Sequence, residues 1–341
     1  MPEVDFDVEV VRGELSEARA DQILEFWSRA GALEGDAARE RLAEVVCVLV
    51  NGAGEVAGVN SVYAAEVPVI GDRRFWIHRS FLPGNASSAQ AAMVSAAFTA
   101  LEAEFEPGGD GPIGICLLVS DPAEQGPEAI SPETELLLAG YLEDGTQVRI
   151  RYFWDAIIGP GVPSSPTQSE SREQEYPLEE RYRVEGFGEP GGPSPDDVIA
   201  FWERLGVVNS AEAQRRVHEV LLVALDETDG LVGVCSAYMS RHAQLRVDLW
   251  HYRTFVVPAH RGSNVAMVMA LEARDLLEQR FVSGEDTRAP GIVYEIENDE
   301  IKLHFNRARL LPPDFTFVGT NGSGDHIRVH YFPGARVPVS S

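Results

Sequence analysis

The sequence contains very little positive charge and almost no lysine. Lys302 is its single lysine, and 28 Lys and Arg residues stand against 54 Asp and Glu residues, so the formal net charge is -26. A strongly acidic protein repels the phosphate groups of nucleic acids and of anionic membrane surfaces. The composition therefore argues against both partners and favours a cationic small molecule or peptide, although solubility alone also accounts for such a charge.

Cysteines and long apolar runs are scarce as well. Cys47, Cys116 and Cys235 lie in apolar, strand-like segments, and none has a close neighbour at the spacing of metal ligands. No apolar run reaches the ~20 residues that span a bilayer. The acidic N-terminal segment lacks the basic region and the apolar run of a signal peptide. We expect buried free thiols, no bound metal, no membrane span and a cytoplasmic location.

Several short segments of the first half of the chain recur, in the same order, in the second half. The pairs are QILEFWSRAG at 22–31 with VIAFWERLG at 198–206, GEVAGVNSVY at 54–63 with DGLVGVCSAY at 229–238, WIHRSF at 76–81 with WHYRTF at 250–255, AMV at 92–94 with AMV at 266–268, and VRIRYF at 148–153 with IRVHYF at 327–332. The repeating unit is far longer than the 20–50 residues of a solenoid repeat. The pattern therefore predicts a duplicated domain.

A segment rich in proline, serine and charged residues lies between the two halves, at 159–177. Such a composition is typical of a linker. We expect an N-terminal domain at 1–156, a linker at 157–177 and a C-terminal domain at 178–341. Hydrophobic residues make up 44% of the chain, which is enough for two packed cores.

The second half predicts the element order strand, two helices, three strands, helix, strand, helix and two strands. Ser194, Pro195 and Asp197 form the start of the first helix, because they suit the N-cap and the first and third helical positions. Residues 298–311 predict the last helix, which the prolines at 312 and 313 would end. The fold class expected for each domain is α/β (α+β), a mixed central sheet flanked by helices.

The turn after the long strand of the second half combines a basic residue with glycine. Arg261, Gly262, Ser263, Asn264, Val265 and Ala266 follow VVPAH at 256–260. With the hairpin before it, and with the strand and the Asn298-led helix after it, this turn resembles the GNAT superfamily of acyl-CoA-dependent N-acyltransferases, in tandem. The resemblance implies two GNAT-like domains, acetyl-CoA or another acyl-CoA as cofactor, and an amine of a small molecule or peptide as acceptor. Asn264 replaces a glycine of the family's turn.

Elementary chemistry explains how this turn would hold a coenzyme without a lysine. A helix N-terminus carries unpaired N–H groups and a partial positive charge, which suit a pyrophosphate. Gly262 would let the backbone approach closely, and Arg261 would add a charged fork. An ordinary turn, with Ser263 as cap and Arg261 in solvent, is the alternative. The cofactor-binding residues that the resemblance implies are Val256, Val257, Arg261, Gly262, Ser263, Asn264, Val265, Ala266 and Asn298.

The first half lacks the features of this turn. Its counterpart residues are Ser87, Ser88, Ala89, Gln90, Ala91 and Ala92, without the arginine or the glycine. Prolines and glycines at 122–132 also replace the late helix. We therefore expect a degenerate N-terminal domain that packs against the C-terminal domain as an intramolecular pseudo-dimer, or that forms a wall of its acceptor cleft. A second acyl-CoA site, built from serine hydroxyls and backbone groups, is the alternative.

The resemblance further implies a general acid, often a tyrosine seven residues after the Asn that opens the late helix. Phe305 occupies that position and cannot donate a proton. Tyr294, Tyr252 and His304 are the candidate replacements. For the base, the long strand offers Asp248, His251 and Tyr252, and His251 is the candidate, since an imidazole titrates near neutral pH. On a regular strand, His251 and Tyr252 face opposite sides. The missing tyrosine leaves open a second interpretation, a non-catalytic acyl-CoA-binding or interaction protein with this fold.

Overall fold

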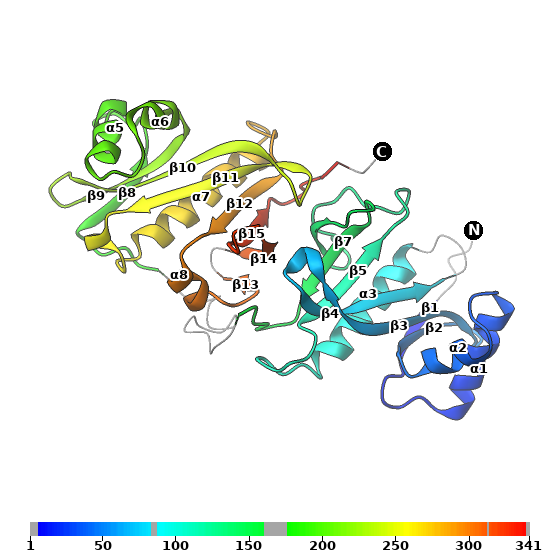
Figure 1. Ribbon diagram of the computed structural model, residues 1–341. Helices are drawn as coiled ribbons and strands as arrows, with labels where there is room; N and C mark the ends of the chain where they lie inside the picture. Colours follow the sequence, from blue (N-terminus) through cyan, green and yellow to red (C-terminus); the bar gives the residue numbers. More distant parts are fainter. Residues whose placement is uncertain (1–5, 83–86, 160–175, 312–313, 339–341) are drawn as a thin grey trace. The chain divides into compact units, whose positions relative to one another are not determined.

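The computed structural model describes residues 6–82, 87–159, 176–311 and 314–338. The chain divides into two compact units, which include residues 6–159 and 176–338 (Figure 1). Most of the linker predicted at 157–177 lies outside the described residues. Within the described ranges, no helix combines the length and the apolar character needed to cross a bilayer.

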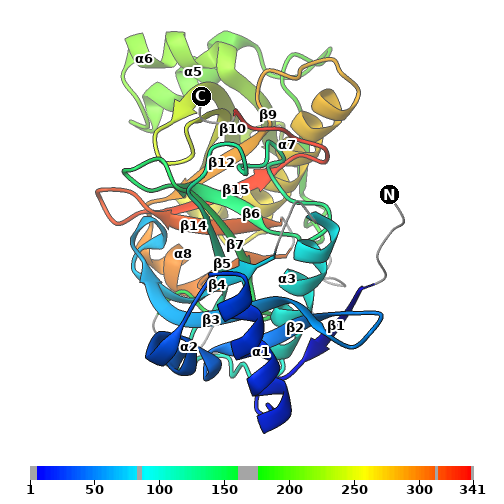
Figure 2. The same cartoon turned by 90° about the vertical axis from the view of Figure 1, so that its right-hand side faces the viewer.

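The N-terminal unit is a seven-stranded mixed sheet with helices on both faces. The strands lie in the order β1-β2-β3-β4-β5-β7-β6, and only β4 and β5 are parallel. Helix α3 lies against β1 and β2 (Figure 2). The elements are β1 (Phe6–Val10), α1 (Glu17–Arg29), α2 (Gly35–Leu42), β2 (Val45–Asn51), β3 (Val56–Val67), β4 (Arg73–Phe81), α3 (Ser87–Glu102), β5 (Gly114–Val119), β6 (Leu137–Tyr141) and β7 (Gln147–Tyr152), with a 3-10 turn η1 (Pro68–Ile70).

The C-terminal unit is an eight-stranded mixed sheet in the order β13-β14-β15-β12-β11-β10-β9-β8. Only β11 and β12 are parallel. Its strands and helices are β8 (Tyr182–Gly186), α5 (Pro195–Arg204), α6 (Ser210–Arg216), β9 (Val220–Asp226), β10 (Leu231–His242), β11 (Val247–Val256), α7 (Val265–Val282), β12 (Gly291–Ile296), α8 (Asp299–His304), β13 (Arg309–Leu310), β14 (Phe315–Thr320) and β15 (His326–Tyr331), with 3-10 turns η2 (Val217–Glu219) and η3 (Pro258–His260). Both units thus have the expected fold class.

Local sequence explains where α5 begins. Ser194 accepts a hydrogen bond from the backbone N–H of Asp197, and the Asp197 carboxylate accepts one from the backbone N–H of Ser194 at 2.8 Å. This capping box satisfies helix N–H groups that would otherwise lack partners. Phe201 and Trp202 then bury one face of α5 against β9 and β10. The sequence prediction of this helix start is confirmed.

Helix α7 covers the opposite face of the same sheet (Figure 1). Val265, Met269, Ala273 and Leu277 are buried at helical spacing. Gly233 of β10 makes room for this packing, because a Cβ there would lie 2.9 Å from the Met269 methyl group. The site described below therefore lies in a sheet that is covered by α5 and α6 on one face and by α7 on the other.

The two sheets share their pairing register as well as their strand order. In the first sheet, three consecutive parallel pairs begin with Trp76 and Ile115 and end with His78 and Leu117. In the second sheet, they begin with Trp250 and Ile292 and end with Tyr252 and Tyr294. The central hairpins also match, since Tyr63 pairs with Ile77 and Tyr238 with His251. Two residues are called equivalent below when they hold the same place in these registers.

The predicted long helix at 298–311 is wrong in its second half, because α8 ends at His304. The buried side chain of Arg328 donates hydrogen bonds to the backbone oxygens of Phe305, Arg307 and Ala308, at 2.7, 2.8 and 3.3 Å. These bonds stabilise a non-helical backbone between α8 and β13. The two prolines expected to stop the helix, at 312 and 313, lie outside the described residues.

The N-terminal unit has a similar buried arginine but no late helix. Arg149, equivalent to Arg328, donates to the backbone oxygens of Gly126 and Glu128 at 2.6 and 2.7 Å. None of the residues 120–136 is helical, as the prolines there predict. The side chain of Arg149 on β7 thus helps to hold the connection before β6.

The three cysteines are buried free thiols, as expected. Burial raises the pKa of Cys47, Cys116 and Cys235 to about 12, so all three stay protonated at neutral pH. Among the described residues, no group of His, Cys, Asp and Glu side chains is arranged to hold a metal ion.

Candidate functional site

The parallel strands β11 and β12 part within the C-terminal unit. They pair over three residues each, and the last pair is Tyr252 with Tyr294. Strand β11 continues to Val256 and β12 to Ile296, and no described strand lies between them. Backbone N–H and C=O groups on the facing edges therefore have no strand partner beyond this point, and a ligand with amide groups can pair with them.

The open end of β11 leads through η3 into a turn with two left-handed residues. Gly262 has φ +89° and Asn264 has φ +56°. Glycine adopts this conformation freely, and asparagine is one of the few other residues that tolerate it. The same property explains how Asn264 can occupy a turn position at which glycine is otherwise favoured.

No side chain among the described residues caps the start of α7. The Ser263 hydroxyl donates to the backbone oxygen of His260 at 2.5 Å, and the Asn264 amide donates to the backbone oxygen of Pro177 at 3.2 Å. The alternative in which Ser263 caps the helix is therefore wrong. The first N–H groups of this 18-residue helix remain available to an anion, and the helix dipole favours one there.

Arg261 is exposed beside this helix start. Its Nε donates to the backbone oxygen of Val256 at 3.1 Å, which fixes the guanidinium near the end of β11. No carboxylate among the described residues forms an ion pair with it, so its remaining N–H groups can bind an anion. Of its neighbours, Val265 is buried in the core and Ala266 is exposed.

The remaining predicted cofactor residues flank this turn. Val256 is buried at the end of β11, and the backbone N–H of Val257 donates to the oxygen of Val232 at 2.9 Å. Asn298 begins α8, because its side-chain oxygen accepts from the N–H groups of Glu300 and Ile301 at 2.9 and 3.1 Å. The side-chain oxygen of Asn298 is thus engaged in its own helix.

Sequence reasoning missed one contact that supports the turn. The Tyr182 hydroxyl and the His260 Nδ1 are 2.8 Å apart, and Tyr182 is buried. The bond joins β8 to η3, directly before Arg261. The two residues are far apart in sequence, and no local pattern indicates their contact.

Tyr252 and Tyr294 meet on the face of the sheet that α7 covers. Their rings are 5.4 Å apart in an edge-to-face arrangement. Tyr252 is buried and its hydroxyl has no hydrogen-bond partner among the described residues, whereas Tyr294 is half-buried. Burial raises the pKa of Tyr294, and it raises the pKa of Tyr252 well above 10. Both hydroxyls therefore carry a proton at neutral pH.

His251 faces the other side of the sheet. The pairing of β10 with β11 is regular, so alternate residues of β11 point to opposite faces. Burial lowers the pKa of His251, while a hydrogen bond to the backbone of Ser240 acts in the opposite direction. Its buried Nε2 has no partner among the described residues. Because the other ring nitrogen makes the Ser240 bond, Nε2 is the nitrogen that can accept a proton.

The candidate acid and base therefore lie on opposite faces, at the place where the strands part. Phe305 is half-buried at the end of α8, and the neighbouring His304 is exposed. A ligand that enters between the separated strands could be reached from both faces of the sheet. This arrangement allows proton transfer from either side of a bound acyl group.

A pocket of about 340 Å³ lies away from these residues, at the start of β11 and the end of α7. Val247, Phe281, Asp248, Arg288 and Arg336 are among its lining residues. Arg261 is at the opposite end of both elements. We therefore assign the pocket no part in the candidate site.

Comparison with known proteins finds similarity only among solved structures. No family model and no curated protein matches the chain. An acetyltransferase of the GNAT family from Streptococcus pneumoniae matches 44% of this chain and 99% of its own, with TM-score 0.33 and 9% identity. Arabidopsis thaliana NAA60 in complex with acetyl-CoA matches 45% of this chain and 99% of its own, with TM-score 0.31 and 12% identity. A putative acetyl transferase from Pyrococcus furiosus matches 38% and 95%, with TM-score 0.27 and 18% identity. The matched solved structures thus include GNAT acetyltransferases, the family that the sequence resembles.

Proposed function

We propose that the C-terminal unit is an acyl-CoA-dependent N-acyltransferase, with acetyl-CoA or another acyl-CoA as the donor. One observation carries the proposal. The parallel strands part at Tyr252 and Tyr294, and the open end of β11 runs directly into the Arg261 turn and the uncapped start of α7. An uncapped helix start beside Arg261, a free strand edge and proton-carrying side chains thus follow one another along the chain.

The residues present fit a coenzyme along this path. The α7 N–H groups and Arg261 would bind the pyrophosphate, since both are free to pair with an anion. The four residues of β11 beyond Tyr252 offer roughly 13 Å of strand edge to the two amides of the pantetheine arm. The bound acyl-CoA would supply the acyl group as a thioester, which this path leads toward Tyr252 and Tyr294.

Three side chains of this unit would handle the protons. A reacting amine must be neutral, and His251 Nε2, which has no partner among the described residues, would accept its proton. Tyr294 or Tyr252 would protonate the leaving thiolate, and Tyr294 is the more exposed of the two. The acceptor is an amine of a small molecule or peptide, because the charge of the protein disfavours nucleic acid and anionic membranes.

We further propose that the N-terminal unit is a duplicated copy with a structural role, and that the protein is cytoplasmic. The shared register and strand order support the first point. Three buried free cysteines are compatible with a reducing compartment, which supports the second. Packing of the two units as a pseudo-dimer remains a prediction.

Titration calorimetry with coenzyme A tests the donor site. Loss of a charge-assisted contact is worth about 1.5–3 kcal/mol, so Arg261→Ala should weaken binding by roughly tenfold or more. Arg336→Ala removes the same charge from an exposed position of the same unit and should leave the affinity unchanged. No binding by the wild type, or equal binding by both variants, would refute the donor site.

Thiol release from acetyl-CoA in the presence of an amine tests catalysis separately. Tyr294→Phe or Tyr252→Phe should lower kcat if that hydroxyl is the acid. Coenzyme binding without turnover on any amine would support the non-catalytic interpretation instead.

A further inference from the structure

Three polar side chains gather on the face of the C-terminal sheet opposite α7. They come from three neighbouring strands, with His242 on β10, His251 on β11 and Glu295 on β12. The His251 ring stacks on Tyr238 at 5.0 Å and on His242 at 5.9 Å between centroids. Glu295 is near enough for its charge to raise the pKa of both imidazoles, against the larger lowering effect of burial.

The equivalent positions of the N-terminal unit are all apolar. The pairs are His242 with Val67, His251 with Ile77 and Glu295 with Leu118. A fold that is complete with valine, isoleucine and leucine at these places does not need polar groups there. Burying His242 and half-burying His251 and Glu295 costs free energy, since each side chain loses hydration. The cluster is therefore explained better by binding than by folding.

A neighbouring cluster of side chains, by contrast, is present in both units. Arg253 lies over the ring of Tyr238 at 3.8 Å and pairs with Glu219 at 3.2 Å. In the N-terminal unit, the equivalent Arg79 lies over the ring of Tyr63 at 4.2 Å and pairs with Glu44. This Tyr–Arg–Glu arrangement occurs in both units, which marks it as structural. The two histidines and Glu295 occur in one unit only.

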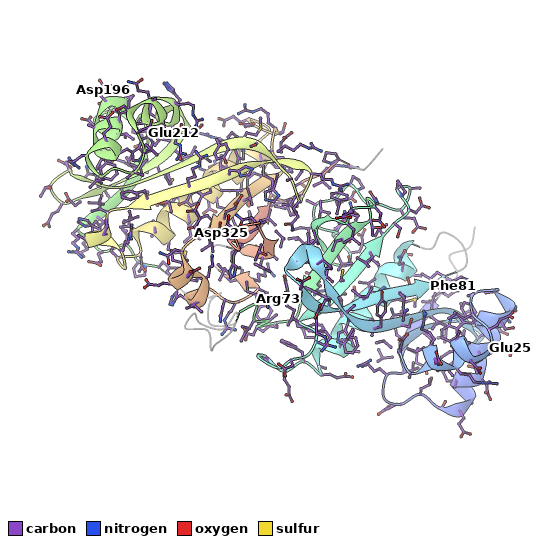
Figure 3. All side chains as sticks on the ribbon, viewed as in Figure 1. Glu25, Arg73, Phe81, Asp196, Glu212 and Asp325 are labelled. Atoms are coloured by element: carbon purple, nitrogen blue, oxygen red, sulfur yellow. The ribbon has the colours of Figure 1, made fainter. Side chains whose placement is uncertain are left out.

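Glu295 is a half-buried carboxylate without a cation. One of its oxygens accepts a hydrogen bond from the Asn321 amide at 2.8 Å, and no basic side chain among the described residues forms an ion pair with it. The single lysine, Lys302, pairs instead with Asp299 and Asp325, at 3.0 and 3.2 Å. Figure 3 labels Asp325, in the turn between β14 and β15. Glu295 is thus not compensated by a basic side chain of the described residues, which leaves it available to a cationic ligand.

The imidazoles beside Glu295 do not supply that cation. Burial lowers the pKa of His242 and of His251, so both rings are neutral at pH 7. The backbone N–H of Leu245 donates to Nδ1 of His242, as expected for a neutral ring. A partly buried carboxylate next to neutral rings attracts a positively charged group.

We propose that Glu295 binds a positive charge on the acceptor, beside the amine that reacts at His251, so that the preferred acceptor is a diamine or another amine with a second positive charge. The description of the bound amine as an acceptor rests on the proposed function. Glu295 lies one strand across and two residues along from His251, which corresponds to roughly 8 Å between Cα atoms. A short aliphatic spacer joins two amines over such a separation.

Binding of two simple amines to the full-length protein tests this inference. The probes are butane-1,4-diamine and butylamine, and the readout is the imidazole 15N spectrum, in which His242→Gln and His251→Gln identify the signals. The diamine should shift both signals, with a Kd about tenfold lower than that of butylamine, because it alone carries the second charge. Equal affinity for the two amines, or no shift at millimolar diamine, would overturn the inference.

Glu295→Gln is the decisive variant, because glutamine keeps an oxygen for Asn321 and removes only the charge. It should raise the Kd for the diamine about tenfold, to the value for butylamine. Glu297→Gln is the matched control, since Glu297 is exposed two residues further along, and it should retain the selectivity. Unchanged diamine affinity in Glu295→Gln would also refute the assignment.

Coenzyme A calorimetry on the same proteins separates this inference from the proposed function. Glu295→Gln should bind coenzyme A as the wild type does. Diamine selectivity without any coenzyme binding would refute the transferase and leave the cation site. Coenzyme binding without diamine selectivity would refute the cation site alone.

Discussion

His78 should make the stability of the N-terminal unit depend on pH. Its side chain is 3% exposed, and neither ring nitrogen has a hydrogen-bond partner among the described residues. Burial lowers the pKa of His78 from 6.5 to about 4. Its equivalent in the other unit is Tyr252, so both sheets carry a buried polar side chain where their parallel strands part.

The sign of this pH dependence follows from proton binding to His78 in the folded and the unfolded states. In the unfolded chain the imidazole takes up a proton below its ordinary pKa of 6.5, whereas in the folded unit it stays neutral down to about pH 4. Acid therefore favours the unfolded state in this window. The stability that His78 contributes is complete above pH 6.5 and is lost as the pH falls toward 4. The pKa difference corresponds to about 3 kcal/mol at 1.36 kcal/mol per pH unit.

Unfolding by urea at neutral pH and near pH 4 measures this effect. His78→Leu removes the titrating group and keeps a side chain of similar size, so the variant should lose about 3 kcal/mol less than the wild type between the two pH values. Carboxylates also titrate on acidification, but they contribute equally to both proteins and cancel in the difference. Tyr252→Phe is the control in the other unit, because its hydroxyl is protonated throughout this range. Parallel pH profiles for the wild type and His78→Leu would show that the ring is not buried as described.

Two further substitutions test packing in the C-terminal unit. Arg328→Met should destabilise the unit by about 3–5 kcal/mol in urea unfolding, because the backbone carbonyls after α8 lose their hydrogen-bond donor. Arg336→Met, at an exposed site, should change the stability by less than about 0.5 kcal/mol. Similar values for the two variants would contradict this interpretation. Gly291→Ala should lower the free energy of unfolding by about 1–3 kcal/mol, because the new Cβ would lie too close to the backbone oxygen of His330. Gly322→Ala is the control in calorimetry, because a Cβ there would meet no atom within 4 Å. Equal melting temperatures for the two alanine variants would show that β12 and β15 can move apart without cost.

Features that depend on nearby residues were predictable from the sequence. The start of α5 follows from Ser194 and Asp197, which are three positions apart and meet within one helical turn. The buried stripe of α7 follows from its spacing. Matching segments of the two halves also predicted a common order of elements, apart from the late helix, which the prolines of the first half exclude.

Features that depend on distant residues were not predictable in this way. The end of α8 is set by Arg328, more than twenty positions later in the chain, whose buried guanidinium takes the carbonyls that a longer helix would need. The stack of His242 on His251 requires the register of β10 on β11, which no local signal specifies. Glu295 meets Asn321 only because β12 pairs with β15. Long-range pairing thus brought together residues that sequence spacing leaves apart.

Some features occur at equivalent positions of both units, and others occur in one unit only. Both units must fold into the same kind of sheet, and both contain the Tyr–Arg–Glu arrangement and a buried arginine that donates hydrogen bonds to backbone carbonyls. They differ at His242, His251 and Glu295, which cost hydration in the C-terminal unit and have apolar counterparts in the other, and the Nε2 of His251 has no partner among the described residues. Departures from the rule that buried polar groups are paired are concentrated at functional sites. However, His78 and Tyr252 show that a buried side chain without a hydrogen-bond partner among the described residues occurs where the parallel strands part in both units, so that feature does not distinguish the two units. The two units differ instead at Arg261 and Gly262, whose counterparts are Ser87 and Ser88, and at His242, His251 and Glu295, whose counterparts are apolar.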